Sequence, residues 1–152
     1  MAEGSNKLRV RLVTPEKVLV EQEVDAVELP AKTGYMEVLY GHAPLLAELG
    51  AGDVTLHGAT NGPGGGVNEG NSDRYNVSWG FVEVLPDRVT ILANGALAPS
   101  QIDTARAKQE LDHGQQLWNE AGDDAEKYEI AEHVIQEAEA KLASAGSSSQ
   151  SH

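Results

Sequence analysis

Hydrophobic and polar residues alternate with a period of two along the chain up to about Asn94. In KLRVRLVT, Leu8, Val10 and Leu12 share one face and the intervening side chains are basic, as in a half-buried strand. The further segments with strand character are Val18–Val24, Ala26–Leu29, Tyr35–Leu39, Leu45–Leu49, Val54–His57, Asn76–Trp79, Phe81–Leu85 and Val89–Leu92. Short strands with a turn signal about every 8–12 residues predict a β-sandwich or barrel.

A segment rich in glycine and asparagine interrupts these strands. Ala59–Asn76 reads ATNGPGGGVNEGNSDRYN and is almost free of apolar residues. The strands on either side look like partners, which predicts an extended hairpin loop. A glycine-rich phosphate cradle is the alternative, but the segment lacks both the GK[ST] ending and a following helix.

After Pro99 the pattern becomes helical. Ser100 and Asp103 match a capping box, and no helix breaker follows until Gly122. In the turn that begins at Gly122, Asp123 and Asp124 can cap a second helix. The apolar positions of the two helices are Ala107, Leu111, Gly114 and Trp118, then Tyr128, Ala131, Ile135, Ala138, Leu142 and Ala145. Two narrow stripes joined by a short turn predict an antiparallel helical hairpin.

The change of periodicity predicts the division of the chain into domains. We expect a β-sandwich over residues 7–97, a helical hairpin over 100–146 and a disordered tail over 147–152. Because the helical stripes are rich in alanine, they bury little apolar area, and we expect the hairpin to detach or change shape at modest cost.

Composition narrows the classes of partner. The 152 residues carry a formal net charge of −13, which disfavours nucleic acid and anionic lipid as partners. The absence of cysteine excludes disulfides and thiolate metal sites. No segment resembles a signal peptide or a membrane span, so we expect a soluble, intracellular protein.

No sequence motif indicates catalysis. The five histidines form no HxH or HExxH arrangement, and no serine lies in a G-x-S-x-G elbow, so we expect neither an enzyme nor a metal or cofactor site. His42 lies between Gly41 and Pro44, in a predicted turn. There we expect its imidazole to bond to nearby backbone.

Several motifs occur in an order that resembles one protein family. They are V-T-P-E from Val13, G-H-A-P-L-L from Gly41, S-x-G-F-x-E-V from Ser78 and I-D-x-x-R-A from Ile102. Over about Leu8–Ala145 the chain resembles the epsilon subunit of bacterial F-type ATP synthase. It departs from the family pattern at Glu37, where the second glycine of G-x-x-G is usual, and at Tyr40, where a proline is usual.

The resemblance implies a fold and a role. The fold would be a ten-stranded β-sandwich followed by a two-helix hairpin. The chain would be a non-catalytic rotor subunit, peripheral on the cytoplasmic face of the bacterial inner membrane. Its partners would be the gamma subunit of the central stalk, the ring of membrane proteolipid subunits and, through the hairpin, the catalytic hexamer, where the hairpin blocks ATP hydrolysis. The implied contact residues are Gly34, Tyr35, Met36, Glu37, Gly41 and His42.

The resemblance also implies a nucleotide site at the start of the first helix. Its residues would be Ile102, Asp103, Arg106 and Ala107. Strong binders carry two arginines in the second helix, where this chain has Glu137 and Lys141, so we expect ATP binding to be weak or absent. The alternative for the whole chain is a stand-alone ligand-binding sandwich with a helical appendage.

Overall fold

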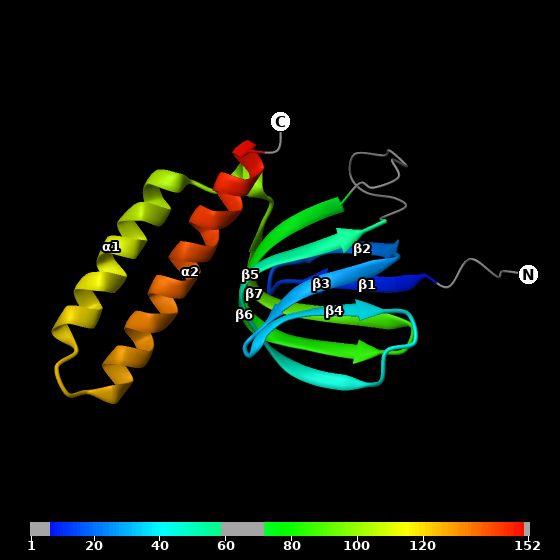
Figure 1. The fold of residues 1–152 in the computed structure, drawn as a ribbon, viewed down its shortest axis with the longest axis horizontal. Coiled ribbons are helices and arrows are strands. Elements are labelled where there is room, and N and C mark those ends of the chain that lie inside the picture. The colour runs from blue at the N-terminus through cyan, green and yellow to red at the C-terminus, as the bar shows by residue number, and fades with distance from the viewer. Residues whose placement is uncertain (1–6, 59–71, 151–152) are drawn as a thin grey trace, which may run out of the picture. The chain divides into compact units, whose positions relative to one another are not determined.

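The structure, a computed structural model, describes residues 7–58 and 72–150. The chain divides into two compact units, Met1–Ala96 and Leu97–His152. The first is built of strands and the second of helices (Figure 1). None of the helices in the described part of the chain is long and apolar enough to cross a membrane.

Seven strands form one mixed sheet in the described part of the first unit. They are β1 (Leu8–Val13), β2 (Val18–Val24), β3 (Ala26–Ala31), β4 (Gly34–Leu39), β5 (Leu45–His57), β6 (Ser72–Leu85) and β7 (Arg88–Leu97). Their order is β2-β1-β7-β6-β5-β3-β4, and β1 pairs with β7 in parallel, whereas the other registered pairs are antiparallel. The alternation in β1 is confirmed, because Leu8, Val10 and Leu12 are all at most 1 % exposed.

Seven strands replace the ten that the resemblance implied. Leu45–Leu49 and Val54–His57 are one strand, β5, and the two segments expected between 76 and 85 are both part of β6. In β6, Trp79 and Gly80 have positive φ (54° and 139°), and the register with β5 is the same on either side of Trp79, from Leu49↔Gly80 to Ala51↔Ser78. A side chain at Gly80 would collide with the Leu92 carbonyl oxygen, so only glycine fits there.

One curled sheet encloses a single hydrophobic core. Buried side chains from all seven strands belong to a single cluster, which includes Leu8, Leu29, Leu56, Val77 and Ile91. A flat sheet could not bring both of its ends to the same cluster. The curled sheet therefore has the architecture of a sandwich without a break between its layers (Figure 1).

The predicted loop is shorter at its C-terminal end than expected. β6 begins at Ser72 and pairs with β5 from His57↔Ser72 to Asp53↔Asn76, so residues 72–76 are strand. The Asn76 side chain is buried and donates to the Gly52 carbonyl at 3.4 Å and to Asp53 Oδ1 at 3.3 Å. These cross-strand hydrogen bonds satisfy the buried Asn76 amide, although asparagine is a residue type that suggested a loop. Residues 59–71 lie outside the described residues.

The second unit contains the 3₁₀ turn η1 (Pro99–Gln101) and the helices α1 (Thr104–Glu120) and α2 (Ala125–Gln150). The N-cap of α1 is Asp103, and the predicted cap at Ser100 is wrong. Asp103 Oδ1 accepts from the Arg106 N–H at 3.1 Å, whereas Ser100 lies within η1. The predicted cap of α2 is confirmed, because Asp124 Oδ1 accepts from the Glu126 N–H at 3.0 Å.

Small residues on the two predicted stripes bring the helices together. Ala107 and Gly114 are buried on α1, as are Ala131 and Ala138 on α2. At the tip of the hairpin, the rings of Trp118 and Tyr128 meet edge to face with centroids 4.7 Å apart. α2 continues over 147–150, where we expected a tail, because Gly146 alone does not stop a helix. Residues 151–152 lie outside the described residues.

Candidate functional site: a partner surface and a hairpin site

The turn between β4 and β5 carries two of the predicted contact residues. Gly41 has a φ of 91°, and its N–H donates to the Pro86 carbonyl at 2.6 Å. The His42 N–H donates to the Leu39 carbonyl at 3.1 Å, and His42 Nδ1 lies 2.7 Å from the Ala43 carbonyl oxygen. The expected bond from the imidazole to nearby backbone is confirmed. Since a carbonyl only accepts, Nδ1 carries the proton.

Large apolar side chains surround this turn and remain exposed. Leu39, Tyr40 and Leu45 are 53 %, 47 % and 41 % exposed, and Leu46 reaches 70 %. These four residues, which we call the apolar turn, lie within eight consecutive positions. A concentration of exposed apolar groups of this kind marks a protein-interaction surface more often than a single exposed leucine does.

The other four predicted contact residues are the first four of the six residues of β4. Gly34 begins the strand with a φ of 138°, and Tyr35 is 63 % exposed, with its hydroxyl accepting from the Asp53 N–H at 2.9 Å. Glu37 is exposed, whereas Met36 is partly buried and packs against the core. At about 3.3 Å per residue, Tyr35 and Leu39 are separated by ~13 Å along the strand. The structure therefore divides the six residues into two groups.

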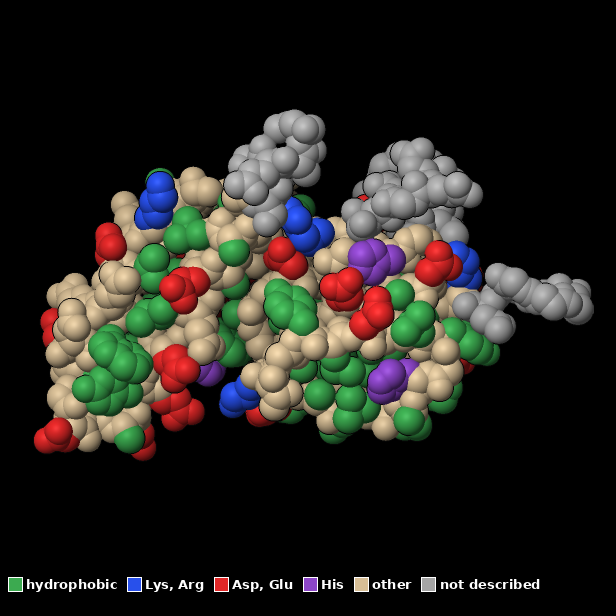
Figure 2. All heavy atoms as spheres, in the orientation of Figure 1, with side chains coloured by type: hydrophobic (Ala, Val, Ile, Leu, Met, Phe, Trp, Pro, Cys, Tyr) green, Lys and Arg blue, Asp and Glu red, His purple; other side chains and the backbone are tan. Residues whose placement is uncertain are grey.

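Sequence reasoning missed part of the exposed apolar surface. Phe81 and Leu92 are each 50 % exposed on the outer sides of β6 and β7. Phe81 lies opposite Glu48 of β5, two residues from the apolar-turn residue Leu46. The signal was present in the alternation, because both residues adjoin positions that are buried, Val82 and Ile91. Apolar side chains also gather on part of the sandwich surface in view in Figure 2.

The predicted nucleotide residues cluster where α1 begins, but most of them have structural partners. Ile102 is partly buried and its N–H donates to the Pro99 carbonyl at 3.3 Å. Asp103 caps the helix, and Ala107 is 1 % exposed. The Arg106 guanidinium pairs with Glu110 at 3.4 Å.

Ion pairs connect this cluster to α2. Glu110 Oε2 lies 3.5 Å from Lys141 Nζ, and Lys141 Nζ lies 3.4 Å from Glu137 Oε1. Glu137 and Lys141, the two positions at which the resemblance led us to expect arginines in strong nucleotide binders, are thus paired with each other. A polyanion would have to compete with carboxylates for both cations here.

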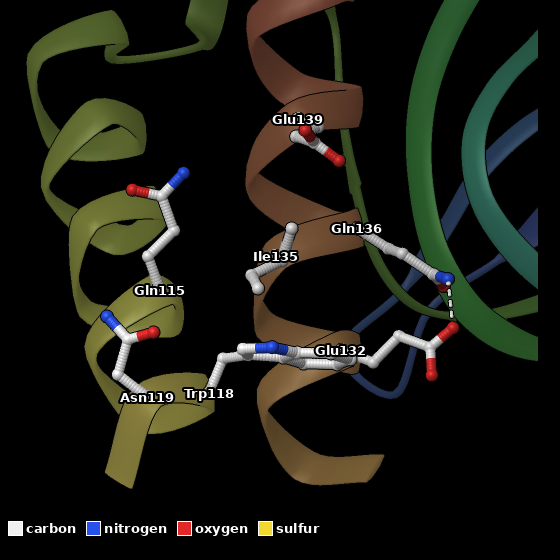
Figure 3. A pocket seen from close by; sticks show the side chains of 7 residues that line it. All are labelled: Gln115, Trp118, Asn119, Glu132, Ile135, Gln136 and Glu139. Atoms are coloured by element: carbon white, nitrogen blue, oxygen red, sulfur yellow. Dashed lines mark hydrogen bonds between the residues drawn. The ribbon is translucent and has the colours of Figure 1, made fainter. Parts of the chain in front are cut away.

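A shallow groove lies between α1 and α2 toward the tip of the hairpin, with a volume of about 580 Å³. Figure 3 shows the Trp118 ring extending from α1 toward α2, with Ile135 beside it. Amide and carboxylate side chains form the rim, and Gln136 donates to Glu132 at 3.0 Å. In the described ranges 7–58 and 72–150, no group of three or more His, Asp or Glu side chains could hold a metal ion.

The comparisons with known proteins agree on one family. Residues 7–99 match the model of the ATP synthase delta/epsilon chain, beta-sandwich domain. The ATP synthase epsilon chain of Koribacter versatilis (strain Ellin345) is 39 % identical over 113 residues, which are 73 % of this chain and 71 % of that one. The ATP synthase epsilon chain of Gloeothece citriformis (strain PCC 7424) is 36 % identical over 141 residues, 91 % of this chain and 95 % of that one.

Solved structures share the fold. A chain in the structure of Euglena gracilis mitochondrial ATP synthase, OSCP/F1/c-ring in rotational state 1, aligns with a TM-score of 0.71 at 21 % identity, covering 91 % of this chain and 81 % of that chain. A chain in the central stalk/c-ring structure of Tetrahymena thermophila mitochondrial ATP synthase aligns with a TM-score of 0.64 at 14 % identity, covering 91 % and 96 %.

Proposed function

We propose that the chain, which belongs to the ATP synthase epsilon chain family, is a non-catalytic subunit of the rotor. In that role it would couple ion-driven rotation of the membrane ring to the catalytic core. Its sandwich would join the gamma subunit of the central stalk to the ring of proteolipid subunits. The subunit would be peripheral, on the cytoplasmic face of a bacterial inner membrane. The absence of a recognisable catalytic motif is consistent with this role.

The exposed apolar turn is the observation that supports contact with the ring. Leu39, Tyr40, Leu45 and Leu46 present apolar side chains around a turn whose backbone is held by Gly41 and Pro86. Burial of one such side chain is worth about 1.5–3 kcal/mol, so a few residues can contribute most of an interface. We place the ring contact here, with Gly41 and His42 in the turn itself. Gly34 and Tyr35 lie at the start of β4 and would meet a different part of the rotor, with Met36 and Glu37 between the two contacts.

A charge in the apolar turn tests this assignment. Leu46→Asp should assemble poorly with the gamma subunit and the proteolipid ring, because Leu46 is 70 % exposed yet would be buried in the complex. The matched control is Val18→Asp, which places the same charge on an exposed apolar residue of β2. Co-purification of the reconstituted complex gives the measurement. Wild-type assembly by Leu46→Asp, with the variant folded by circular dichroism, would remove the apolar turn from the interface.

We assign the helical hairpin a regulatory role. It would contact the catalytic hexamer and inhibit ATP hydrolysis when it extends. Its small-residue interface supports this assignment, because a weak interface allows two arrangements of similar free energy. ATP binding by Ile102, Asp103, Arg106 and Ala107 would be weak or absent, since Arg106 and Lys141 already pair with carboxylates.

A further inference from the structure

The open end of the helical hairpin, away from the turn that joins the helices, carries a chain of ion pairs. Arg106 pairs with Glu110 within α1, and Lys141 pairs with Glu137 within α2. Of these three ion pairs, the contact between Glu110 Oε2 and Lys141 Nζ, at 3.5 Å, is the one that joins the two helices. Positions 110 and 141 therefore connect the halves of the hairpin at the end where no covalent turn holds them.

Partial burial makes this contact stronger than an ordinary surface pair. The Lys141 side chain is 19 % exposed and those of Glu110 and Glu137 are each 34 % exposed, whereas Arg106 is 77 % exposed. Salt and water screen a partly buried pair less than an exposed one. The Glu110–Lys141 contact should therefore contribute more to helix association than the Arg106–Glu110 pair.

Lys141 also prevents a repulsion. Its ammonium lies within 3.5 Å of a carboxylate on each helix, so that Glu110 and Glu137 approach one another around it. Residues 100–152 contain only four basic residues against eleven acidic ones, so few cations are available to replace it. Removal of Lys141 would leave two like charges facing each other across the interface between the helices.

We propose that Glu110 and Lys141 form an electrostatic clasp that holds the open end of the hairpin closed and keeps its cations occupied. Ionic strength, rather than an anionic ligand, then sets how often α1 and α2 separate. Glu110 acts as an internal competitor that excludes phosphate-like anions from Arg106 and Lys141. The clasp requires only the hairpin of this chain and does not depend on the rotor function proposed above.

Hydrogen exchange of the isolated full-length protein tests the clasp. Lys141→Met keeps most of the aliphatic stem and removes the charge. We expect it to accelerate exchange of the α1 and α2 amides about three- to tenfold at low salt, as loss of a partly buried pair implies. Wild-type exchange should accelerate as sodium chloride is added, whereas exchange of the variant should slow, because salt screens the repulsion between Glu110 and Glu137.

Two control variants separate charge from packing. Lys108→Met removes the same charge from an exposed position on α1 and should leave exchange unchanged. Lys141→Arg keeps a cation and should retain most of the protection. If Lys141→Met exchanges no faster than Lys108→Met, there is no clasp. Equal salt sensitivity of Lys141→Met and the wild type would also overturn it.

Titration with inorganic triphosphate tests the exclusion of anions. Glu110→Gln keeps the shape of the side chain, frees Arg106 and leaves Lys141 paired with Glu137 alone, so calorimetry should show binding at least tenfold tighter than to the wild type. The double variant Glu110→Gln with Lys141→Met should lose that gain. Equal affinities of Glu110→Gln and the wild type, with the helicity of both unchanged, would refute the competitor role of Glu110.

Discussion

Gly114 packs closely against α2, and its replacement by alanine tests how the hairpin is held together. A Cβ atom at this position would lie 2.8 Å from Ile135 Cγ1, 3.1 Å from Val134 Cγ1 and 3.2 Å from the Ile135 backbone nitrogen. The first two neighbours are side-chain atoms that can rotate, but the third belongs to the backbone of α2. A methyl group would therefore push the helices apart by a few tenths of an ångström.

Two effects of opposite sign follow from Gly114→Ala. Alanine favours the helical state of α1 by about 0.8–1.0 kcal/mol relative to glycine. Overpacking of a close contact costs about 1–3 kcal/mol. The net effect should be a destabilisation of the packed hairpin by about 0–2 kcal/mol, although α1 alone becomes a better helix. Gly146→Ala is the matched control, because no atom lies within 4 Å of a Cβ there, and it should stabilise the helix.

Thermal unfolding followed by circular dichroism at 222 nm, together with hydrogen exchange of α1 and α2, would measure both variants. We expect Gly146→Ala to raise the melting temperature of the helical signal and Gly114→Ala to leave it unchanged or lower it. Amides of α1 should exchange faster in Gly114→Ala despite its higher intrinsic helicity. If both variants stabilise the hairpin equally, close packing at Gly114 does not hold the helices together.

Two further predictions concern the division of the chain. Ending the chain after Ala98 should leave a folded sandwich that still joins the rotor, and ATP hydrolysis by the assembled complex should rise; assembly without a rise in hydrolysis would contradict the inhibitory role. Replacement of residues 59–71 by Asn-Gly should change the free energy of unfolding little, since a doubling of loop length costs only ~0.6 kcal/mol. Replacement of residues 59–76 should unfold part of the sheet, because Tyr75 and Asn76 belong to β6. Denaturant titration of both deletions gives the comparison, and equal stability would refute the pairing of residues 72–76.

Local sequence patterns predicted the strands and helices better than the boundaries between them. The alternation around Leu8 and the aspartate at Asp124 depend on neighbours within a few residues, and the structure agrees with both. The merging of predicted strands into β5 and β6 depends instead on the curvature of the whole sheet. Gly80 separated two predicted strands, Asn76–Trp79 and Phe81–Leu85, whereas it lies within the single strand β6 with a positive φ.

The start of α1 shows why a cap can be misplaced. Ser100 and Asp103 both favour the N-cap position, and both precede a helical pattern. The choice between them is made by a 3₁₀ turn, in which the Gln101 side chain accepts from the Ala98 N–H at 2.9 Å. The Ile102 N–H, which a cap at Ser100 would have to bind, donates instead to the Pro99 carbonyl at 3.3 Å, and the α-helix begins at Thr104.

The candidate site was harder to predict because it depends on how two helices face each other. His42 could be interpreted from Gly41 and Pro44 alone, since its partner is the next residue. The pairing of Glu110 with Lys141 joins residues 31 positions apart. This pairing depends on how each helix is rotated about its own axis. The narrow alanine stripes in the sequence specify that rotation only weakly.

The two units of the chain are held by different chemistry, and the proposed roles of a static clamp and a movable inhibitor would require such a difference. The sandwich core contains fully buried leucine and valine side chains, each worth about 1.5–3 kcal/mol, and it should open only when the whole unit unfolds. The hairpin interface contains Ala107, Gly114, Ala131 and Ala138 at its centre, with an ion pair at its open end. Alanine burial contributes little, so the charged pair forms a larger share of the association free energy. Salt screening weakens the ion pair of the hairpin and leaves the apolar core of the sandwich unaffected. The helices can therefore separate under conditions in which the sandwich stays folded.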